Sequence, residues 1–326
     1  MRRLPAEWEP QQRVYLSFPR RDGDWGEILP DASSAMIAAA NQINTVCPVT
    51  LVVGDPVHFA DYAHAYQGDV LEAPTDDCWI RDSGPITVLA PEARMMDFTF
   101  NGWGGKFDAS LDNQLPAIIQ ASDFPDVAYD RVTTVLEGGS IESDGAGSIL
   151  TTTRCLLSEG RNDFTDRYQA EAVLREYLGA QRILWLEHGE LAGDDTDAHI
   201  DTVARFYAPN TIAYVQPPGS EDSHHADFSR MQTELQAFAN EYRLLGLPFA
   251  DPVYSAIDGH RLPASYANFL LCNGYLFLPV YDVPSDARAI EILEQDGTYH
   301  VVPVNCRSFI EQHGALHCLT MQVPAW

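Results

Sequence analysis

The sequence predicts an α/β fold, because short runs typical of strands alternate with helical patterns along the whole chain. The strand-like runs are rich in β-branched or aromatic residues, and they lie at 14–18, 49–53, 86–89, 148–152, 200–207, 211–215, 267–271, 275–280 and 299–304. Helix candidates lie between several of them, at 31–45, 166–178, 228–245 and 285–295.

The third of these helix candidates has the clearest apolar stripe. Its apolar residues are spaced alternately four and three apart, which places them on one face of a helix. They are Met231, Leu235, Phe238, Tyr242 and Leu245. We interpret this stripe as core packing.

No stretch of the chain has the composition of a linker between domains. Glycine and proline punctuate every connection, and the most loop-like segment, 216–225, precedes a helix candidate. A chain of 326 residues exceeds the usual domain size. We therefore predict a single domain over residues 1–326, built from repeated strand and helix units that are not visible as sequence similarity.

The charge balance restricts the classes of partner. Lysine and arginine total 20 against 47 aspartate and glutamate residues, for a net charge of -27. Such a field disfavours nucleic acid and anionic membranes, and it concentrates small cations near a cleft. A solvated acidic surface explains the charge equally well. The N-terminus lacks an apolar segment of the signal-peptide type and no apolar run could span a membrane, so we expect a cytoplasmic protein. Whether it forms a homo-oligomer is left open.

The six cysteines are scattered and form no C-x-x-C pair, which favours free thiols over a zinc cluster or a disulfide framework. Cys318 follows His317 and lies close to Gly314. A catalytic thiol needs a neighbouring cation or proton acceptor, and either the histidine or a cationic substrate could serve. A cysteine taken alone is more often a small buried hydrophobe.

Two acidic segments could complete a site with such a thiol. The first, 193–201, carries four aspartates and His199; if 199–206 is a strand, His199 and Asp201 project from the same face. A cation site or a solvated acidic loop is the alternative. The second, 76–85, sets carboxylates beside Trp79, a natural seat for a planar guanidinium, although a surface Asp–Arg ion pair would look the same.

Taken together, these segments resemble the agmatine deiminase family of the guanidine-modifying (pentein) superfamily. The resemblance rests on ordered motifs across most of the chain: Asp77-x-Trp79-x-Arg81-Asp82-x-Gly84-Pro85, Asn101-x-Trp103-Gly104-Gly105, Glu137-Gly138-Gly139, Asp144-Gly145-x-Gly147, Asp194 to Asp201, Ala264-Ser265-Tyr266-x-Asn268-Phe269 and His317-Cys318-Leu319-Thr320. It implies a five-bladed α/β propeller around a central active site.

The resemblance also implies a role for each matching residue. Cys318 corresponds to the nucleophile, His199 to the general acid/base, and Asp82 and Asp201 to the carboxylates that grip the guanidinium. Trp79 takes the place of an aromatic residue at the substrate. Asp194 and Asp195 match acidic positions that could face a distal amine, with Asp194 the better candidate.

The implied reaction is hydrolysis of agmatine to N-carbamoylputrescine and ammonia, a step of putrescine and polyamine biosynthesis, with no metal or organic cofactor. The chain departs from the family pattern at Ala198 and at 312–316, where glycines are usual, so the loop before the nucleophile is bulkier.

Three alternatives remain. The substrate could be another guanidine, such as free or peptide-terminal arginine, or the reaction could be amidino transfer. An arginine carboxylate would need a distal cation, which Arg205 or Arg81 could supply only if its side chain pointed inward. A non-catalytic propeller that binds polyamines or partner proteins would require the four catalytic matches to be coincidental.

Overall fold

A computed structural model describes residues 2–326 of the chain. Its strands form five separate mixed sheets over this range. The sheets, in spatial order of their strands, are β16 (Thr320–Pro324), β1 (Gln11–Ser17), β2 (Val49–Val53) and β3 (Asp69–Glu72); β4 (Ile86–Ala90), β5 (Glu92–Thr99) and β6 (Ala128–Val135); β7 (Ile141–Ser143), β8 (Ser148–Thr152) and β9 (Arg182–Leu186); β10 (Ala204–Ala208), β11 (Thr211–Val215) and β12 (Arg243–Leu247); and β13 (Leu270–Cys272), β14 (Tyr275–Val280) and β15 (His300–Asn305). The predicted α/β class is confirmed.

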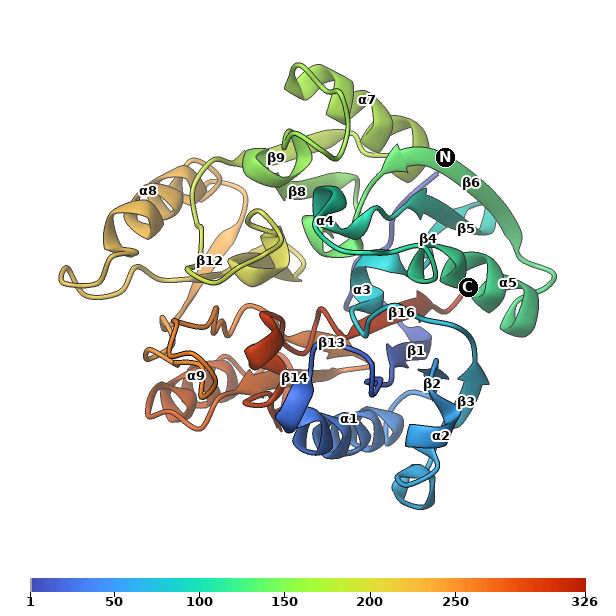
Figure 1. Ribbon diagram of the computed structural model, residues 1–326. Coiled ribbons are helices and arrows are strands. Elements are labelled where there is room, and N and C mark those ends of the chain that lie inside the picture. The colour runs from blue at the N-terminus through green and yellow to red at the C-terminus, as the bar shows by residue number, and fades with distance from the viewer. Residues whose placement is uncertain (1) are drawn as a thin grey trace.

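The sheets repeat one pairing pattern. In each, a central strand pairs antiparallel with one neighbour and parallel with the other, as β8 does with β7 and β9. The first sheet joins the two ends of the chain, because β1 pairs antiparallel with β16 and parallel with β2. Successive sheets follow one another around the centre of the view in Figure 1.

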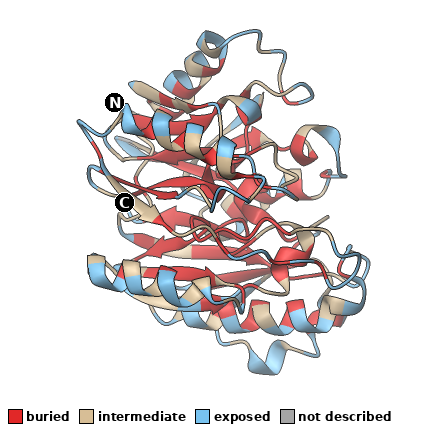
Figure 2. Ribbon diagram, turned by 90° about the vertical axis from the view of Figure 1, so that its left-hand side faces the viewer, coloured by how far each residue is buried: buried red, intermediate tan, exposed pale blue. Residues whose placement is uncertain are grey.

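The long helices lie outside the sheets and turn an apolar face toward them, whereas the short helices α3 (Ile80–Ser83) and α4 (Gly102–Gly105) lie toward the centre of the view in Figure 1. The other helices are α1 (Leu29–Asn44), α2 (Pro56–Phe59), α5 (Leu115–Asp123), α6 (Thr153–Leu156), α7 (Arg167–Leu178), α8 (His225–Gln236) and α9 (Ser285–Asp296). Figure 2 shows long helices with exposed outer faces beside buried strands. No helix in the described part of the chain is both long and apolar enough to cross a membrane.

Three of the predicted elements are wrong in part. The run at 200–207 opens with a 3₁₀ turn, Ile200–Thr202, and only then becomes β10. The strand predicted at 267–271 begins only at Leu270, as β13, because a turn precedes it. The helix predicted at 228–245 ends at Gln236, because the residues from Arg243 pair with β11 as strand β12. The stripe is accordingly divided among a helix, the turns that follow it and a strand, although Met231, Leu235 and Tyr242 share one core cluster.

Candidate active site

One open cavity gathers the predicted substrate-facing residues. It has an empty volume of about 810 Å³, and its lining includes Cys318, Asp82, Trp79, Asp194 and Asp195. The remaining two predicted residues, His199 and Asp201, are fully buried beside it. All seven predicted residues therefore lie at or against one cavity, although they come from segments far apart in the sequence.

Gly139 lies where His199, Asp82 and Asp201 meet, beside the cavity. A Cβ atom added there would lie 2.6 Å from His199 Nδ1, 2.8 Å from Asp82 Oδ1 and 3.0 Å from Asp201 Oδ2. Glycine is needed at this position because any side chain would fill the space between the imidazole and the two carboxylates. His199 and Asp201 reach this point from the 3₁₀ turn and not from the predicted strand.

Asp82 is fixed by two donors. The indole Nε1 of Trp103 donates to its Oδ2 (2.9 Å), and the N–H of Gly139 donates to its Oδ1 (2.9 Å). The short helix α3, which carries Asp82, is held against the nucleophile loop because the Arg81 N–H donates to the Cys318 carbonyl (3.2 Å). The carboxylate is therefore oriented before any ligand binds.

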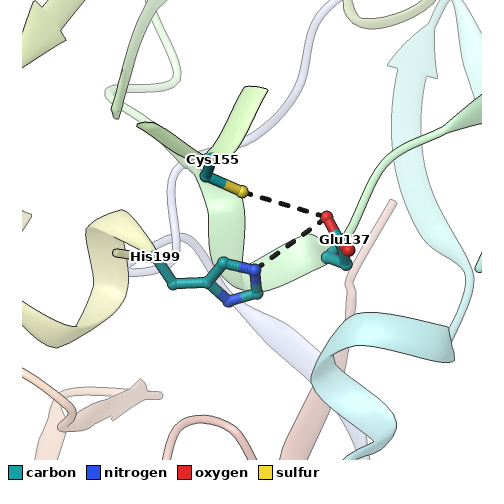
Figure 3. A group of neighbouring side chains, drawn as sticks. All are labelled: Glu137, Cys155 and His199. Atoms are coloured by element: carbon teal, nitrogen blue, oxygen red, sulfur yellow. Dashed lines mark hydrogen bonds and ion pairs between the residues drawn. The ribbon is translucent and has the colours of Figure 1, made fainter. Parts of the chain in front are cut away.

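His199 lies between two carboxylates. Its Nδ1 is 3.7 Å from Asp82 Oδ1, and its Nε2 is 3.9 Å from Glu137 Oε2. Figure 3 shows the His199 imidazole and the Cys155 thiol both facing the Glu137 carboxylate. Burial acts to lower the pKa of His199, but Asp82, Cys155 and Glu137 outweigh it and raise the pKa well above its ordinary value. The imidazole is thus held in its protonated, proton-donating form.

The Cys318 thiol is 5% exposed and faces this group of residues. Asn268 Nδ2 donates to Sγ (3.2 Å), and Asp201 Oδ2 lies 3.8 Å from it. Burial, with the negative charges of Asp201 and Asp82, raises the pKa of the thiol well above its ordinary value. A cation bound between the two carboxylates would cancel that charge and favour the thiolate.

Asp201 has one oxygen engaged and one free. Its Oδ2 lies 2.7 Å from His317 Nδ1, whereas its buried Oδ1 has no hydrogen-bond partner among the described residues. Burial acts to raise the pKa of Asp201, but the His317 contact outweighs it and the pKa is lowered. Both ring nitrogens of His199 are likewise buried without a hydrogen bond in the described part of the chain. Buried polar atoms without partners are rare and call for a ligand.

The two outer aspartates differ in what they already bind. The Asp194 carboxylate accepts from Thr196 N (3.1 Å), Thr196 Oγ1 (2.6 Å) and Ala198 N (2.7 Å). Its hydrogen bonds therefore stabilise the loop that carries it. Asp195 Oδ2 lies 3.7 Å from His313 Nε2. Of the pair, Asp195 has fewer hydrogen bonds to its own loop.

The outer lining as a whole is acidic. Asp24 and Asp77 line it as well, and no lysine or arginine within residues 2–326 does. Arg81 and Arg205, considered above as partners of a substrate carboxylate, are buried elsewhere: Arg205 binds Glu7 and Glu142, and Arg81 binds Gln322. The cavity therefore suits a ligand with cationic ends.

Comparison with known proteins places this geometry in a family. Residues 3–324 match the family described as Porphyromonas-type peptidyl-arginine deiminase. The chain belongs to this family. It is 34% identical to an agmatine deiminase of Pseudomonas fluorescens, over 99% of this chain and 95% of that protein. The resemblance to agmatine deiminases that the motifs indicated is confirmed.

Solved structures agree. A cysteine-to-serine variant of the agmatine deiminase of C. jejuni with substrate bound superposes with a TM-score of 0.93, at 33% identity, over 99% of this chain and 96% of that one. A dimethylarginine dimethylaminohydrolase, at 15% identity and a TM-score of 0.58 over 96% of this chain and all of that one, shares the fold alone.

Within this deiminase family site, sequence reasoning assigned no role to three residues that touch the predicted ones. They are Glu137 beside His199, Asn268 on the thiol and Trp103 on Asp82. The sequence offers His317 as a group that could activate the adjacent thiol, but its two ring nitrogens lie against Asp201 and Glu7. All four belong to the motifs that carried the resemblance, so the signal was in the sequence. What it lacked was the pairing, which only the fold provides.

Two groups of side chains lie close enough to share a cation: Glu137, Cys155 and His199, and Glu7, Glu142 and His317. An arginine already serves the carboxylates of each. Arg161 Nε donates to both oxygens of Glu137 (2.9 and 3.0 Å), and Arg205 pairs with Glu7 (2.8 Å) and Glu142. These guanidinium groups supply the positive charge that the acids need, and we assign no metal to either group.

Proposed function

We propose that this chain is a hydrolase of C–N bonds in linear amidines that converts agmatine to N-carbamoylputrescine and ammonia. The observation that carries the proposal is a buried, unpartnered acceptor beside the cavity, Asp201 Oδ1, next to the imidazole of His199, whose ring nitrogens also have no hydrogen-bond partner among the described residues. A guanidinium supplies N–H donors in a fixed plane, which suits Asp201 and Asp82. The Cys318 thiol lies beside the same carboxylates.

In the proposed mechanism, Asp82 and Asp201 hold the guanidinium and its charge stabilises the Cys318 thiolate. The thiolate attacks the central carbon and forms a C–S bond. Protonated His199 donates to the departing nitrogen, the C–N bond breaks, and ammonia leaves an S-alkylthiouronium on Cys318. His199 then takes a proton from water as the water attacks the same carbon. The C–S bond breaks, the thiolate returns, and loss of the hydroxyl proton gives the ureido product.

The outer lining supports agmatine over arginine as the substrate. Trp79 and the acidic residues Asp24, Asp77 and Asp195 would favour an alkyl chain that ends in ammonium. An arginine carboxylate would meet the same negative charges, and the lining described above offers it no lysine or arginine. The relatives in this family that are named agmatine deiminases support the same choice.

We further propose that the chain forms one domain, residues 1–326, and that its five sheets are the blades of a five-bladed propeller. The repeated pairing pattern supports this arrangement, as does the pairing of β1 with β16, which would join the last blade to the first.

An ammonia-release assay tests the function. We expect release from agmatine that exceeds release from arginine, short arginyl peptides and guanidinobutyrate. Cys318→Ala should abolish ammonia release while the unfolding transition is retained. Cys47→Ala, which removes a buried thiol that does not line the cavity, is the matched control. Full activity of Cys318→Ala would refute the mechanism, and preference for another guanidine would refute agmatine as the substrate.

A further inference from the structure

A second buried charge cluster lies behind Asp201, away from the substrate cavity. It comprises Glu7, Arg81, Glu142, Arg205 and His317, and we call it the rear cluster. His317 joins it to the active site: its Nδ1 lies 2.7 Å from Asp201 Oδ2 and its Nε2 lies 2.7 Å from Glu7 Oε2. The imidazole is therefore clamped between two carboxylates, and both contacts are short.

The two contacts fix the orientation of this imidazole. The pKa of Asp201 and that of Glu7 are both lowered, so each is an ionised acceptor, and the ring nitrogen Nδ1 donates to Asp201. At the other end of the ring, Nε2 lies beside the Glu7 carboxylate and 2.9 Å from Arg205 Nη2. Burial opposes the lowered pKa of Glu7, and Arg205 and His317 outweigh it. Arg205 Nη2 also donates to Glu7 Oε2 (2.8 Å), which leaves that oxygen an acceptor.

Glu7 is held in place independently of His317. It comes from the segment before β1, and its Oε1 accepts from the Leu271 N–H of β13 (2.7 Å). The groups that face His317 come from four other elements or loops. Asp201 comes from the 3₁₀ turn and Glu7 from the N-terminal segment. Arg205 of β10 places its Nη2 2.9 Å from His317 Nε2, and Arg81 of α3 donates from Nε to the His317 carbonyl (3.3 Å). Glu142 in β7 pairs with Arg205, and its carboxylate also lies within 4.8 Å of a His317 ring nitrogen.

We infer that Glu7 and His317 are positioning residues of the deiminase reaction: Glu7 holds the His317 ring in place, and the Nδ1–H of His317 pins Asp201 Oδ2 so that Oδ1 faces the substrate. The inference rests on the proposed function. The pinned Oδ2 is also the oxygen that lies 3.8 Å from Cys318 Sγ. A proton donor on that oxygen weakens its repulsion of the thiolate. Glu7 thus acts on the reacting atoms through one histidine.

Glu7→Gln tests the inference, because it removes the charge and keeps the shape. We expect kcat/KM for agmatine to fall on the order of 10- to 100-fold, as when residues that orient a functional group are changed elsewhere. The contact with His317 holds the pKa of Asp201 below its ordinary value, so a less firmly held ring should move the acidic limb of the kcat/KM profile to higher pH. In a His317→Asn background, which has no imidazole on Asp201, Glu7→Gln should no longer move that limb.

The matched control is Glu9→Gln. Glu9 lies in the same segment, but it pairs with Arg3 and accepts from the Ala6 N–H, so wild-type kinetics are expected. Glu7→Asp keeps the anion and should keep the wild-type acidic limb even if the rate falls or Glu7→Gln does not fold. Wild-type kinetics in Glu7→Gln, or a shifted limb in Glu7→Asp, would overturn the inference. A wild-type chain without activity on any guanidine would overturn the proposed function instead.

Discussion

At the scale of single residues, the predicted site was accessible to sequence reasoning where a residue carries its own chemistry. Cys318, His199, Asp82 and Asp201 can act as nucleophile, acid/base and carboxylates, and they meet at one cavity. The roles of Glu137 and His317 depend on contacts with His199 and Asp201, which are 62 and 116 positions away in the chain respectively. No local sequence pattern encodes such contacts, so the motifs could be predicted from the sequence but the contacts between them could not.

Gly139→Ala is a sharp test at this scale. The added methyl group would occupy the space between His199 Nδ1, Asp82 Oδ1 and Asp201 Oδ2, where the guanidinium is proposed to bind. We expect kcat/KM to fall by about 100-fold or more, since small displacements of reacting groups cost that much. Steady-state kinetics with agmatine would measure it. Gly219→Ala is the control, because a Cβ there meets nothing within 4 Å; equal kinetics in both variants would contradict the assigned binding point.

At the scale of elements, the sequence was most informative where a strand is buried on both faces. The fully buried strands β2, β8 and β11 lie at their predicted bounds. Strands at the edge of a sheet were harder. β3 is mostly exposed and polar, and β12 is rich in leucine, a good helix former, so both lack the pattern of a central strand. Their conformation is imposed by the neighbouring strand, which is a tertiary effect.

Helix α7 provides a prediction about an element far from the chemistry. Its N-cap is Asp166, whose side chain accepts from the Gln169 N–H (3.1 Å). Asp166→Ala should lower the free energy of unfolding by about 1 kcal/mol, the usual value of a lost N-cap, and leave agmatine kinetics unchanged. Denaturant unfolding would measure the loss. Asp163→Ala removes an exposed aspartate three residues earlier and serves as control; equal stability of the two variants would show that the cap is unimportant.

At the scale of the whole molecule, the repeated architecture was inferred from alternation alone. Each sheet repeats an antiparallel pair followed by a parallel strand, yet the units share a pattern of burial and not of residue identity. The pairing of β1 with β16 was beyond the sequence, because a contact between the two ends of a chain leaves no local signal. That same pairing brings the N-terminal segment, and Glu7 with it, close to the nucleophile loop.

The distribution of buried acids gives the molecule a pH-dependent stability. Burial raises the pKa of Asp77 to about 6, of Asp112 to about 7 and of Glu142 to about 8. At a pH between the ordinary carboxyl pKa and the raised pKa of one of these groups, that group is protonated in the folded chain and ionised in the unfolded chain. The free energy of unfolding therefore falls as pH rises, by up to about 1.4 kcal/mol per pH unit for each such group. Glu7 and Asp201 have lowered pKa values and add stability that is lost only in stronger acid.

We therefore expect the chain to be more stable at pH 6 than at pH 8.5, as measured by denaturant unfolding. The net charge of -27 also lowers the stability at higher pH, because repulsion between like charges grows as acids ionise. Added salt should reduce this repulsion but not the effect of the buried carboxyl groups. Asp112→Asn separates the two causes. The Asp112 carboxylate accepts from the Asp76 and Asp77 N–H groups, and the substitution removes its titrating proton. The free energy of unfolding should then depend less steeply on pH, even in high salt. Asp163→Asn, at an exposed position, should leave this dependence unchanged. Stability that rises between pH 6 and 8.5 would contradict the raised carboxyl pKa values.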